Sequence, residues 1–329
     1  MSESHLLTSS PDTVHWGFFD SALVPVLTIR SGDEVRIETV NGQPRDLVGL
    51  QFEMLPEHQA IHRDCTPKLG PHIVTGPIAV DGAQPGDLLE VRVVDIELRQ
   101  DWGWNAIRPL RGTLPDDFPI TQLLHVPIDR SRNVATLPFG PRIPLRPFFG
   151  IMGVAPPPAY GAISSIEPRE HGGNIDNKEL GVGAIVYFPV HVPGALFSVG
   201  DGHAVQGDGE VDLSALETSL TGVFRLTVHP GIEALLPFAI TQRHVITMGF
   251  DEDLDEAARK ALREMIQLIG RATGWPHAFA YAFCSMACDL RITQMVDGEK
   301  GVHAMVEHSL LTPHLSKPFL ALKPQSPDA

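Results

Sequence analysis

The chain has 329 residues, with 40 Asp and Glu against 25 Lys and Arg, so its formal net charge is −15 at pH 7. A chain of this length can bury a substantial core. Its acidity and its lack of a basic cluster argue against nucleic acid or an anionic membrane as partners. No run approaches 18 apolar residues and the first residues lack the pattern of an export signal, so no membrane span is expected. Three cysteines, an odd number, argue against a disulfide framework and for the cytoplasm.

The first half of the chain predicts β-strands separated by turns. Its glycines and prolines fall between short apolar runs, which is typical of a β-rich fold. Residues 27–40 alternate around a turn and predict a hairpin, and residues 87–98 predict a further strand. Residues 55–71 are polar and irregular, so we expect a loop. Residues 101–160 are rich in proline and aromatic residues and predict an extended passage over the core, with a boundary near residue 150.

The second half predicts strands followed by two late helices. Strands are expected at 184–192, 222–229, 238–247 and 291–296. Asp253 can cap a helix near residues 253–270, in which apolar residues recur every three or four positions. Pro276 suits the first turn of a second helix, near residues 276–289.

The predicted fold is therefore mainly β, with sandwich-like or barrel-like layers, and α+β overall. We expect a β-rich N-terminal domain over residues 1–150 and a β-rich C-terminal domain with helices over residues 151–329. An interleaved arrangement of the two as one compact unit remains open.

Two polar clusters threaded with glycine flank the apolar strand predicted at 184–192. The members are His171, Asn174, Asp176, Asn177 and Lys178 in the first cluster, and Asp201, His203, Gln206, Asp208 and Glu210 in the second. Glycine lets a backbone approach a ligand closely, which favours a built site, although Asp-Gly is also ordinary turn chemistry. Side chains alternate along a strand, so Asp201 shares a face with His203, and Asp208 with Glu210. A carboxylate beside an imidazole is a common start for a zinc site.

Several of these motifs resemble signature segments of the acetamidase/formamidase family. They are HGGNID (171–176), GDGHAVQGDGE (200–210) and GPIAVDGAQPGDLLEV (76–91), and the likeness continues at 14–35 and 285–306. The resemblance implies hydrolysis of a short amide to a carboxylate and ammonia by a mainly β protein that forms homo-oligomers, dimers or higher. It also implies a metal at the active site, with Zn²⁺ expected and a second divalent ion such as Ca²⁺ left open.

We therefore hypothesise that Asp176, Asp201 and His203 hold Zn²⁺. Zinc lowers the pKa of a bound water from about 15.7 toward 7, which makes hydroxide available at neutral pH for attack on the amide carbonyl. Glu210, or alternatively Asp208, would act as general base and return the proton to the leaving nitrogen.

Other residues of the clusters are expected to bind the substrate. The turn at Gly172 and Gly173 could offer backbone N–H groups to the oxyanion, while His171 could orient or donate. Asn174 is a further candidate for substrate binding. His72, in the upstream motif, is expected to reach the same site.

Two alternative functions are also consistent with the sequence. In the first, Cys284 is a thiolate nucleophile with His303 as its partner, although the i, i+4 spacing of Cys284 and Cys288 on an apolar stripe favours packed thiols. In the second, the chain is a non-enzymatic β protein that binds a carbohydrate or a metal. The sequence contains neither G-x-S-x-G nor H-E-x-x-H, so the nucleophile elbow of a serine hydrolase and the commonest zinc helix are excluded.

Overall fold

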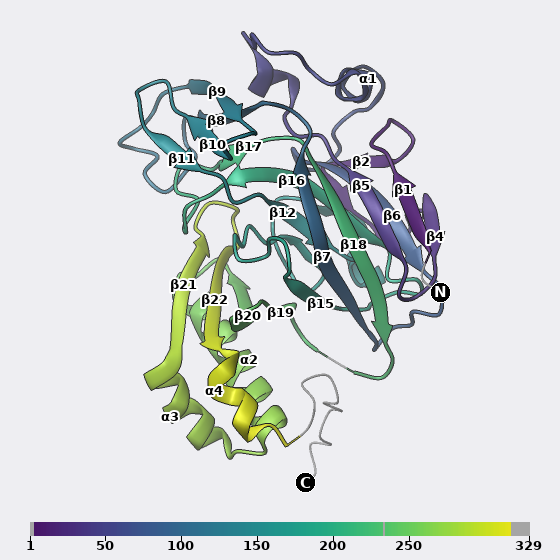
Figure 1. The fold of residues 1–329 in the computed structure, drawn as a ribbon, viewed down its shortest axis with the longest axis vertical. Helices are drawn as coiled ribbons and strands as arrows, with labels where there is room; N and C mark the ends of the chain where they lie inside the picture. The colour runs from purple at the N-terminus through teal and green to yellow at the C-terminus, as the bar shows by residue number, and fades with distance from the viewer. Residues whose placement is uncertain (1–2, 233, 317–329) are drawn as a thin grey trace.

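The structure, a computed structural model, describes residues 3–232 and 234–316. Two large sheets and a small two-stranded sheet form its framework, and strands hold more residues than helices, so the prediction of a mainly β fold is confirmed (Figure 1). Among the described residues, no helix is both long and apolar enough to cross a membrane.

The first large sheet has nine strands in the order β1-β5-β18-β7-β15-β19-β20-β22-β21. They are β1 (Ser4–Leu7), β5 (Glu34–Glu38), β18 (Leu220–His229), β7 (Leu88–Leu98), β15 (Ile185–Pro189), β19 (Phe238–Ile240), β20 (His244–Asp251), β22 (Lys300–Glu307) and β21 (Cys288–Gln294). Neighbours are antiparallel except for β1 and β5.

The second large sheet has eleven strands, eight of them in the order β11-β10-β9-β8-β17-β16-β12-β14. These are β11 (Arg142–Pro144), β10 (Val134–Thr136), β9 (Gln122–Asp129), β8 (Trp102–Ile107), β17 (Leu216–Glu217), β16 (Phe197–Val205), β12 (Phe148–Gly153) and β14 (Gly172–Asn174). The branch consists of β6 (Ile73–Val80), which pairs with β16, and of β2 (Val14–Trp16) and β4 (Leu27–Ile29), which pair with β6. The separate pair is β3 (Phe18–Phe19) and β13 (Ile163–Ser164).

The main core lies between the two large sheets. Apolar side chains from both meet there, among them Ile37, Val91 and Phe224 from the first sheet and Phe149 and Phe197 from the second. Each large sheet combines strands from before and after residue 150, so the two parts of the chain share their sheets.

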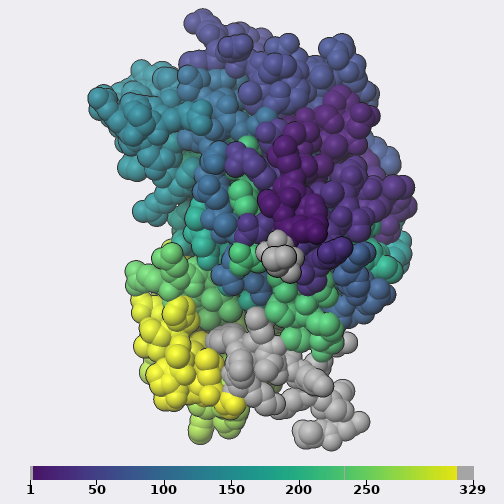
Figure 2. All heavy atoms as spheres, turned by 45° about the vertical axis from the view of Figure 1, so that its right-hand side comes forward, coloured from purple at the N-terminus to yellow at the C-terminus, as the bar shows by residue number. Residues whose placement is uncertain are grey.

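The late helices pack on one end of the first sheet. Helices α2 (Leu254–Thr273) and α3 (His277–Ala287) form a second core with β20 and β22. The Asp253 side chain accepts hydrogen bonds from the backbone N–H groups of two residues in the first turn of α2, which confirms the predicted cap. Figure 2 shows the end of the described chain, residues 300–316 in yellow, at one end of the molecule and the purple N-terminal segment away from it.

The remaining helices are short. They are α1 (Pro56–Asp64), α4 (His308–Leu311), η1 (Pro44–Leu47), η2 (Pro158–Tyr160) and η3 (Thr312–His314). Helix α1 lies where the sequence predicted a loop. Pro56 occupies its first turn, and its buried residues are His58 and Ile61, so one large apolar position is too weak a periodic signal.

Other predicted elements differ in their pairing. Residues 27–40 form two strands, but β4 pairs with β6 and β5 with β1 and β18, so the turn crosses between sheets and makes no hairpin. Residues 238–247 hold two strands, β19 and the start of β20, joined by a turn. Residues 101–160 form strands of the second sheet, β8 to β12.

Candidate active site

Near Asp201, strand β16 changes which of its two faces lies against the core. Val199 belongs to the main core, and a Cβ on Gly202 would meet Leu220, which also belongs to that core. Two residues three positions apart therefore face the same way, because Asp201, with φ of 55°, breaks the alternation of the strand. The break turns Asp201 and His203 away from the apolar core.

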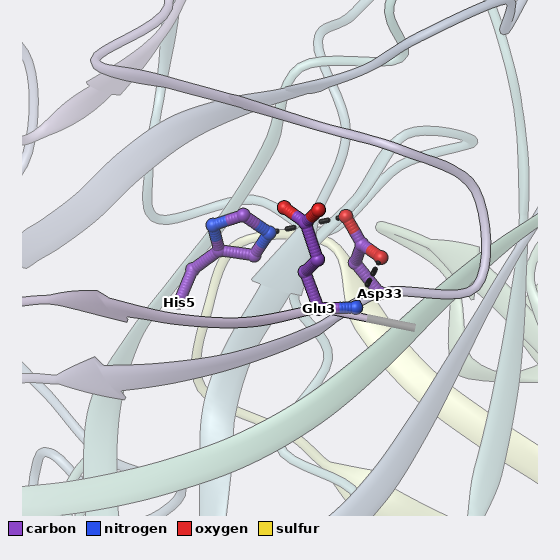
Figure 3. A group of neighbouring side chains, drawn as sticks. All are labelled: Glu3, His5 and Asp33. Carbon is purple, nitrogen blue, oxygen red and sulfur yellow. Dashed lines mark hydrogen bonds and ion pairs between the residues drawn. The ribbon is translucent and has the colours of Figure 1, made fainter. Parts of the chain in front are cut away.

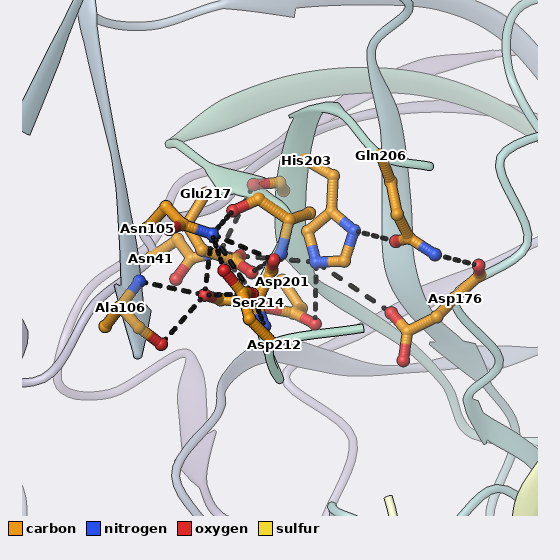
Figure 4. Close-up of polar contacts among 12 residues, drawn as sticks. Asn41, Asn105, Ala106, Asp176, Asp201, His203, Gln206, Asp212, Ser214 and Glu217 are labelled. Atoms are coloured by element: carbon orange, nitrogen blue, oxygen red, sulfur yellow. Dashed lines mark hydrogen bonds and ion pairs between the residues drawn. The ribbon is translucent and has the colours of Figure 1, made fainter. Parts of the chain in front are cut away.

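Three carboxylates converge on one imidazole nitrogen (Figure 4). The Nε2 atom of His203 lies 3.2 Å from Asp201 Oδ2, 3.2 Å from Glu217 Oε2 and 3.8 Å from Asp176 Oδ1. All four side chains are buried. They come from three segments: β16, the two-residue strand β17 beside it, and the chain just after β14.

A hydrogen-bond relay from Gln206 fixes the tautomer of His203. The Gln206 side-chain N–H donates to the backbone carbonyl of Asp176 at 2.8 Å, so its Oε1 faces His203 Nδ1 at 2.9 Å. Because Oε1 can only accept, Nδ1 carries the proton. In a neutral imidazole, Nε2 then turns its lone pair toward the carboxylates, as it does in a metal-ligating histidine.

Asn41 holds two of the carboxylates from the other side. Its Nδ2 group donates to Asp201 Oδ1 at 3.0 Å and to Glu217 Oε2 at 2.7 Å. The backbone N–H of Ala215 donates to Glu217 Oε1 at 2.9 Å. The other oxygen of Asp201, Oδ2, faces the imidazole. Hydrogen bonds from Asn41 and from the Ala215 backbone therefore hold both carboxylates in position around His203.

A second carboxylate group adjoins the first. Ligand atoms of Asp176, His203 and Glu210 lie within 4.8 Å of one another, and Asp297 is near enough to perturb Asp176. Both carboxylate oxygens of Asp176, Oε2 of Glu210 and Oδ2 of Asp297 are buried and have no hydrogen-bond partner in the described part of the chain. Such orphaned acceptors point to a bound group or a proton that completes them.

Burial and mutual repulsion set the charges of these groups. Burial raises the pKa of Glu210 and of Asp297 well above the usual range, and the Asp176 carboxylate raises both further. Burial and the Asp201 carboxylate likewise raise the pKa of Glu217 to about 7. Burial alone would lower the pKa of His203, but the carboxylates of Glu217 and Asp201 raise it well above its ordinary value. The cluster therefore demands a cation at Nε2, either a proton or a metal ion.

Gly150 on β12 leaves the room that the cluster needs. A Cβ at this position would lie 2.4 Å from Asp176 Oδ1, 2.7 Å from Asp201 Oδ2 and 2.8 Å from His203 Cε1. Any side chain would therefore collide with the site. Asp176, Asp201 and Glu210 also have positive φ, which is uncommon for residues other than glycine and clusters at functional sites.

The donor set fits a zinc ion. Ligands about 2.0–2.1 Å from tetrahedral zinc lie about 3.3 Å from one another, close to the separations from His203 Nε2 to Asp201 and Glu217. One imidazole with carboxylates suits zinc or a similar divalent ion. The metal set predicted from sequence, Asp176, Asp201 and His203, lies within this group, to which the structure adds Glu217.

A cavity of about 390 Å³ opens onto the cluster. Asp201, Glu210, Glu217 and Asp297 line its acidic part. Asn174 and His72, both predicted to bind substrate, also line the cavity, and Asn174 Oδ1 is buried without a partner among the described residues.

Other predicted residues lie elsewhere. Asp208 is exposed and forms an ion pair with Lys178 at 3.0 Å, because the chain has left strand β16 and alternation no longer places it beside Glu210. His171 is buried with its ring 4.9 Å from that of Phe19 and is not among the described residues that line the cavity.

The predicted oxyanion turn is partly occupied by other bonds. The backbone N–H of Gly172 donates to the Arg169 carbonyl at 2.9 Å, so this group is not available to a substrate. Gly173 has φ of 83°, and a Cβ there would lie 2.9 Å from His171 Nε2. The close approach of the His171 ring therefore explains why residue 173 is a glycine.

The predicted cysteine pair is not assembled. Cys284 packs against α2 in the second core, together with Val302 and Ala304 of β22. His303 lies between those residues on the strand, so its side chain points to the opposite face of the sheet and bonds Thr293. A Cys284–His303 catalytic pair is therefore wrong for this fold.

A further acidic group, Glu3, His5 and Asp33, is explained by strand pairing (Figure 3). Asp33 accepts hydrogen bonds from the backbone N–H of Glu3 at 2.8 Å and of Arg30 at 3.0 Å, and it lies 3.0 Å from His5 Nε2. These bonds anchor β1 beside β5. They leave Asp33 little capacity for a metal.

Comparison with known proteins shows which proteins this chain resembles in sequence and in fold. The Acetamidase/Formamidase family model matches residues 7–160 and 158–306. The structure is similar to that of an acetamidase from Bacillus halodurans (TM-score 0.82, 29% identity, 94% of this chain and 99% of that one). It is also similar to a recombinant predicted acetamidase/formamidase from Thermoanaerobacter tengcongensis (TM-score 0.83, 28% identity, 95% and 99%).

A formamidase from Methylophilus methylotrophus is 31% identical over an alignment of 191 positions, gaps included, that covers 43% of this chain and 47% of that protein. The match thus spans about half the length of the curated relative. The fold and the site define a β-sandwich protein with a buried carboxylate–imidazole centre. This chain belongs to the acetamidase/formamidase family.

Proposed function

We propose that the chain is an amidohydrolase that converts a short-chain amide to a carboxylate and ammonia with the help of a bound zinc ion. The convergence of three carboxylates on His203 Nε2, at the wall of a cavity, carries this proposal. Family membership supports the reaction class. The fixed tautomer of His203 and the orphaned oxygens of Asp176 support the metal.

In this proposal Asp201, His203 and Glu217 hold the ion, and Asp176 completes the group. A zinc ion bound there supplies Lewis acidity and lowers the pKa of water toward about 7. Asn41 and Gln206 keep the ligands in place through the bonds described above. A second divalent ion near Asp176 remains part of the proposal.

Glu210 is the proposed proton carrier. Burial and its carboxylate neighbours raise its pKa, so it takes up a proton more readily than an ordinary glutamate and can then pass that proton on. It would pass a proton to the leaving nitrogen, because ammonia departs far more easily than amide ion. Asp297, whose pKa burial also raises, lies close enough to Glu210 for its carboxylate to raise the pKa of Glu210 further.

Two polar side chains of the cavity are placed to bind the amide. Asn174 Oδ1 lacks a partner and can accept from the substrate NH₂ group. The Trp104 indole N–H is buried without a partner among the described residues and can donate to the carbonyl oxygen. Together they complement the donor and acceptor of an amide.

Release of ammonia from formamide and acetamide tests the reaction class. We expect ammonia and carboxylate in equal amounts from the wild-type chain, and rates unaffected by an alkylating reagent, because Cys284 lies in the helical core. A chain that binds metal but releases no ammonia from any small amide would be a binding protein instead.

We also propose that the chain forms homo-oligomers through α3 and the edge strand β21. Helix α3 contains no Asp, Glu, Lys or Arg, yet Phe279, Tyr281 and Met286 are 67%, 59% and 80% exposed. A helix that is apolar all round is normally buried. Leu290 and Ile292 are exposed on β21, the edge strand of the first sheet, which lies beside α3 in Figure 1 and extends the apolar surface.

Met286→Glu should dissociate this assembly, because a carboxylate cannot be buried unpaired in an apolar interface. Sedimentation equilibrium should give at least twice the mass of one chain for the wild type and a smaller assembly for the variant. Val24→Glu is the control. Val24 is also 80% exposed, but it lies far from α3 in sequence, just before β4 of the second sheet. A monomeric wild type, or a variant with unchanged mass, would remove this surface as the interface.

The three cysteines are free thiols, which agrees with the proposal of a reducing compartment, the cytoplasm.

A further inference from the structure

The cavity is larger than a formamide or acetamide needs. Its volume of about 390 Å³ falls in the range of about 300–1,000 Å³ that holds ligands of drug size. The acidic cluster occupies one part of its wall. The rest is lined by apolar side chains, among them Val40, Leu69 and Ile73, and by a second set of charged residues.

The second set is basic. Arg45, Lys68, Arg108 and Arg111 line the cavity from three separate segments of the chain, and Asp46 is the one acidic residue of the lining outside the catalytic cluster. This reverses the balance of the chain, which has 40 acidic and 25 basic residues. We call these four residues the basic rim, because Lys68 and Arg111 are exposed and Arg45 is 63% exposed, whereas the catalytic carboxylates are buried.

The basic rim has more cationic side chains than carboxylates that pair with them. Arg108 and Arg45 share the single carboxylate of Asp46. None of the ion pairs within the described residues involves Lys68 or Arg111, and the Lys68 ammonium lies 4.4 Å from the centre of the Phe18 ring. Two cationic residues of the cavity lining, Lys68 and Arg111, therefore have no carboxylate partner among the described residues.

We propose that the site takes amides whose acyl part ends in a carboxylate, which the basic rim binds while the amide reaches the His203 cluster. This inference rests on the proposed amide hydrolysis and names its substrate class. Guanidinium groups pair well with carboxylates through two parallel N–H bonds, and a cavity wall focuses their field. The apolar side chains that also line the cavity suit the methylene groups that separate the two ends of such a substrate.

Two amides of equal chain length test the proposal. Succinamate carries a carboxylate at its far end, and butyramide carries a methyl group there. We expect a higher kcat/KM for succinamate, and an advantage that shrinks as salt is raised, because exposed charges are screened. If both amides are hydrolysed equally well, the rim serves only to offset the acidic cluster and the inference is wrong.

Substitutions at the rim locate the effect. Arg111→Gln and Lys68→Gln should each lower kcat/KM for succinamate, with a loss of about tenfold for Arg111, which is one charge-assisted hydrogen bond. Neither should change the value for butyramide. Arg132→Gln is the control, because Arg132 is 72% exposed and is not among the cavity-lining residues.

Binding of succinate, measured by titration calorimetry, separates this inference from the proposed reaction. Succinate would be the product and needs no hydrolysis to bind. Binding that weakens in Arg111→Gln supports the rim even if no amide is cleaved, in which case the proposed hydrolysis alone fails. Amide hydrolysis without any binding of succinate would overturn the rim and leave the hydrolysis standing.

Discussion

Replacing His203 with alanine should abolish metal binding and amide hydrolysis together. The imidazole is the one neutral donor among carboxylates that are buried and close together, and its Nε2 is the point on which they converge. Loss of a metal that contributes several kcal/mol to transition-state stabilisation corresponds to a fall in kcat/KM on the order of a thousandfold or more. Metal content of the purified variant and its rate of ammonia release measure both effects.

His303→Ala is the matched control for this substitution. His303 is as deeply buried as His203 and also lies on a strand, but its ring bonds Thr293 and it belongs to neither ligand group that contains His203. Both variants lose a buried imidazole, so thermal unfolding should report a comparable cost. Only His203→Ala should lose the metal. A His203→Ala protein that is active and contains a full complement of metal would show that His203 is not a ligand.

A methyl group at Gly150 should have an effect of similar size without removing any functional group. In Gly150→Ala the new carbon would lie 2.4 Å from Asp176 Oδ1 and 2.7 Å from Asp201 Oδ2, so at least one carboxylate must move. Overpacking of this kind costs about 1–3 kcal/mol of stability. We expect the larger consequence to be loss of the metal and of activity, because ligand positions must hold to within about 0.5 Å.

Gly207→Ala gives the comparison for Gly150→Ala. Gly207 follows Gln206 in sequence, yet a Cβ there would meet no atom within 4 Å. This variant should bind metal and release ammonia at the wild-type rate. Equal behaviour of the two alanine variants would mean that Gly150 does not keep open the space for the metal.

Strand periodicity could predict part of the site. It placed Asp201 and His203 on one face, and their side chains lie 3.2 Å apart. The same rule failed for Asp208 and Glu210, because β16 ends at Val205 and the two residues lie in a turn, with Asp208 exposed and Glu210 buried. Periodicity carries information only within the strand, and the sequence does not mark where the strand ends.

Residues brought in by sheet pairing could not be predicted in the same way. Glu217 belongs to a two-residue strand, too short for any periodic signal, and reaches the site because β17 pairs with β16. Asn41 lies 160 positions from Asp201 in sequence. Asp297, which directly follows the strand predicted at 291–296, enters the site because the turn between β21 and β22 lies there. Such contacts depend on register between distant strands, which one sequence does not reveal.

The glycine that makes room for the site lies outside the two polar clusters. Glycines inside the two polar clusters indicated a site, but the glycine that makes room for it is Gly150, in a run of apolar and aromatic residues upstream. A glycine flanked by large apolar residues in a predicted strand indicates close approach of another group. Residues 148–153 fit that rule, and as β12 they pair directly with β16 beside the cluster.

Metal content, measured together with activity, tests the central claim most directly. Elemental analysis of the purified wild-type chain should find about one zinc per chain at the His203 cluster, apart from any second divalent ion near Asp176. Ammonia release should fall when a chelator removes the metal and return when zinc is added. Full activity in a metal-free sample would contradict a metal-assisted mechanism at this site.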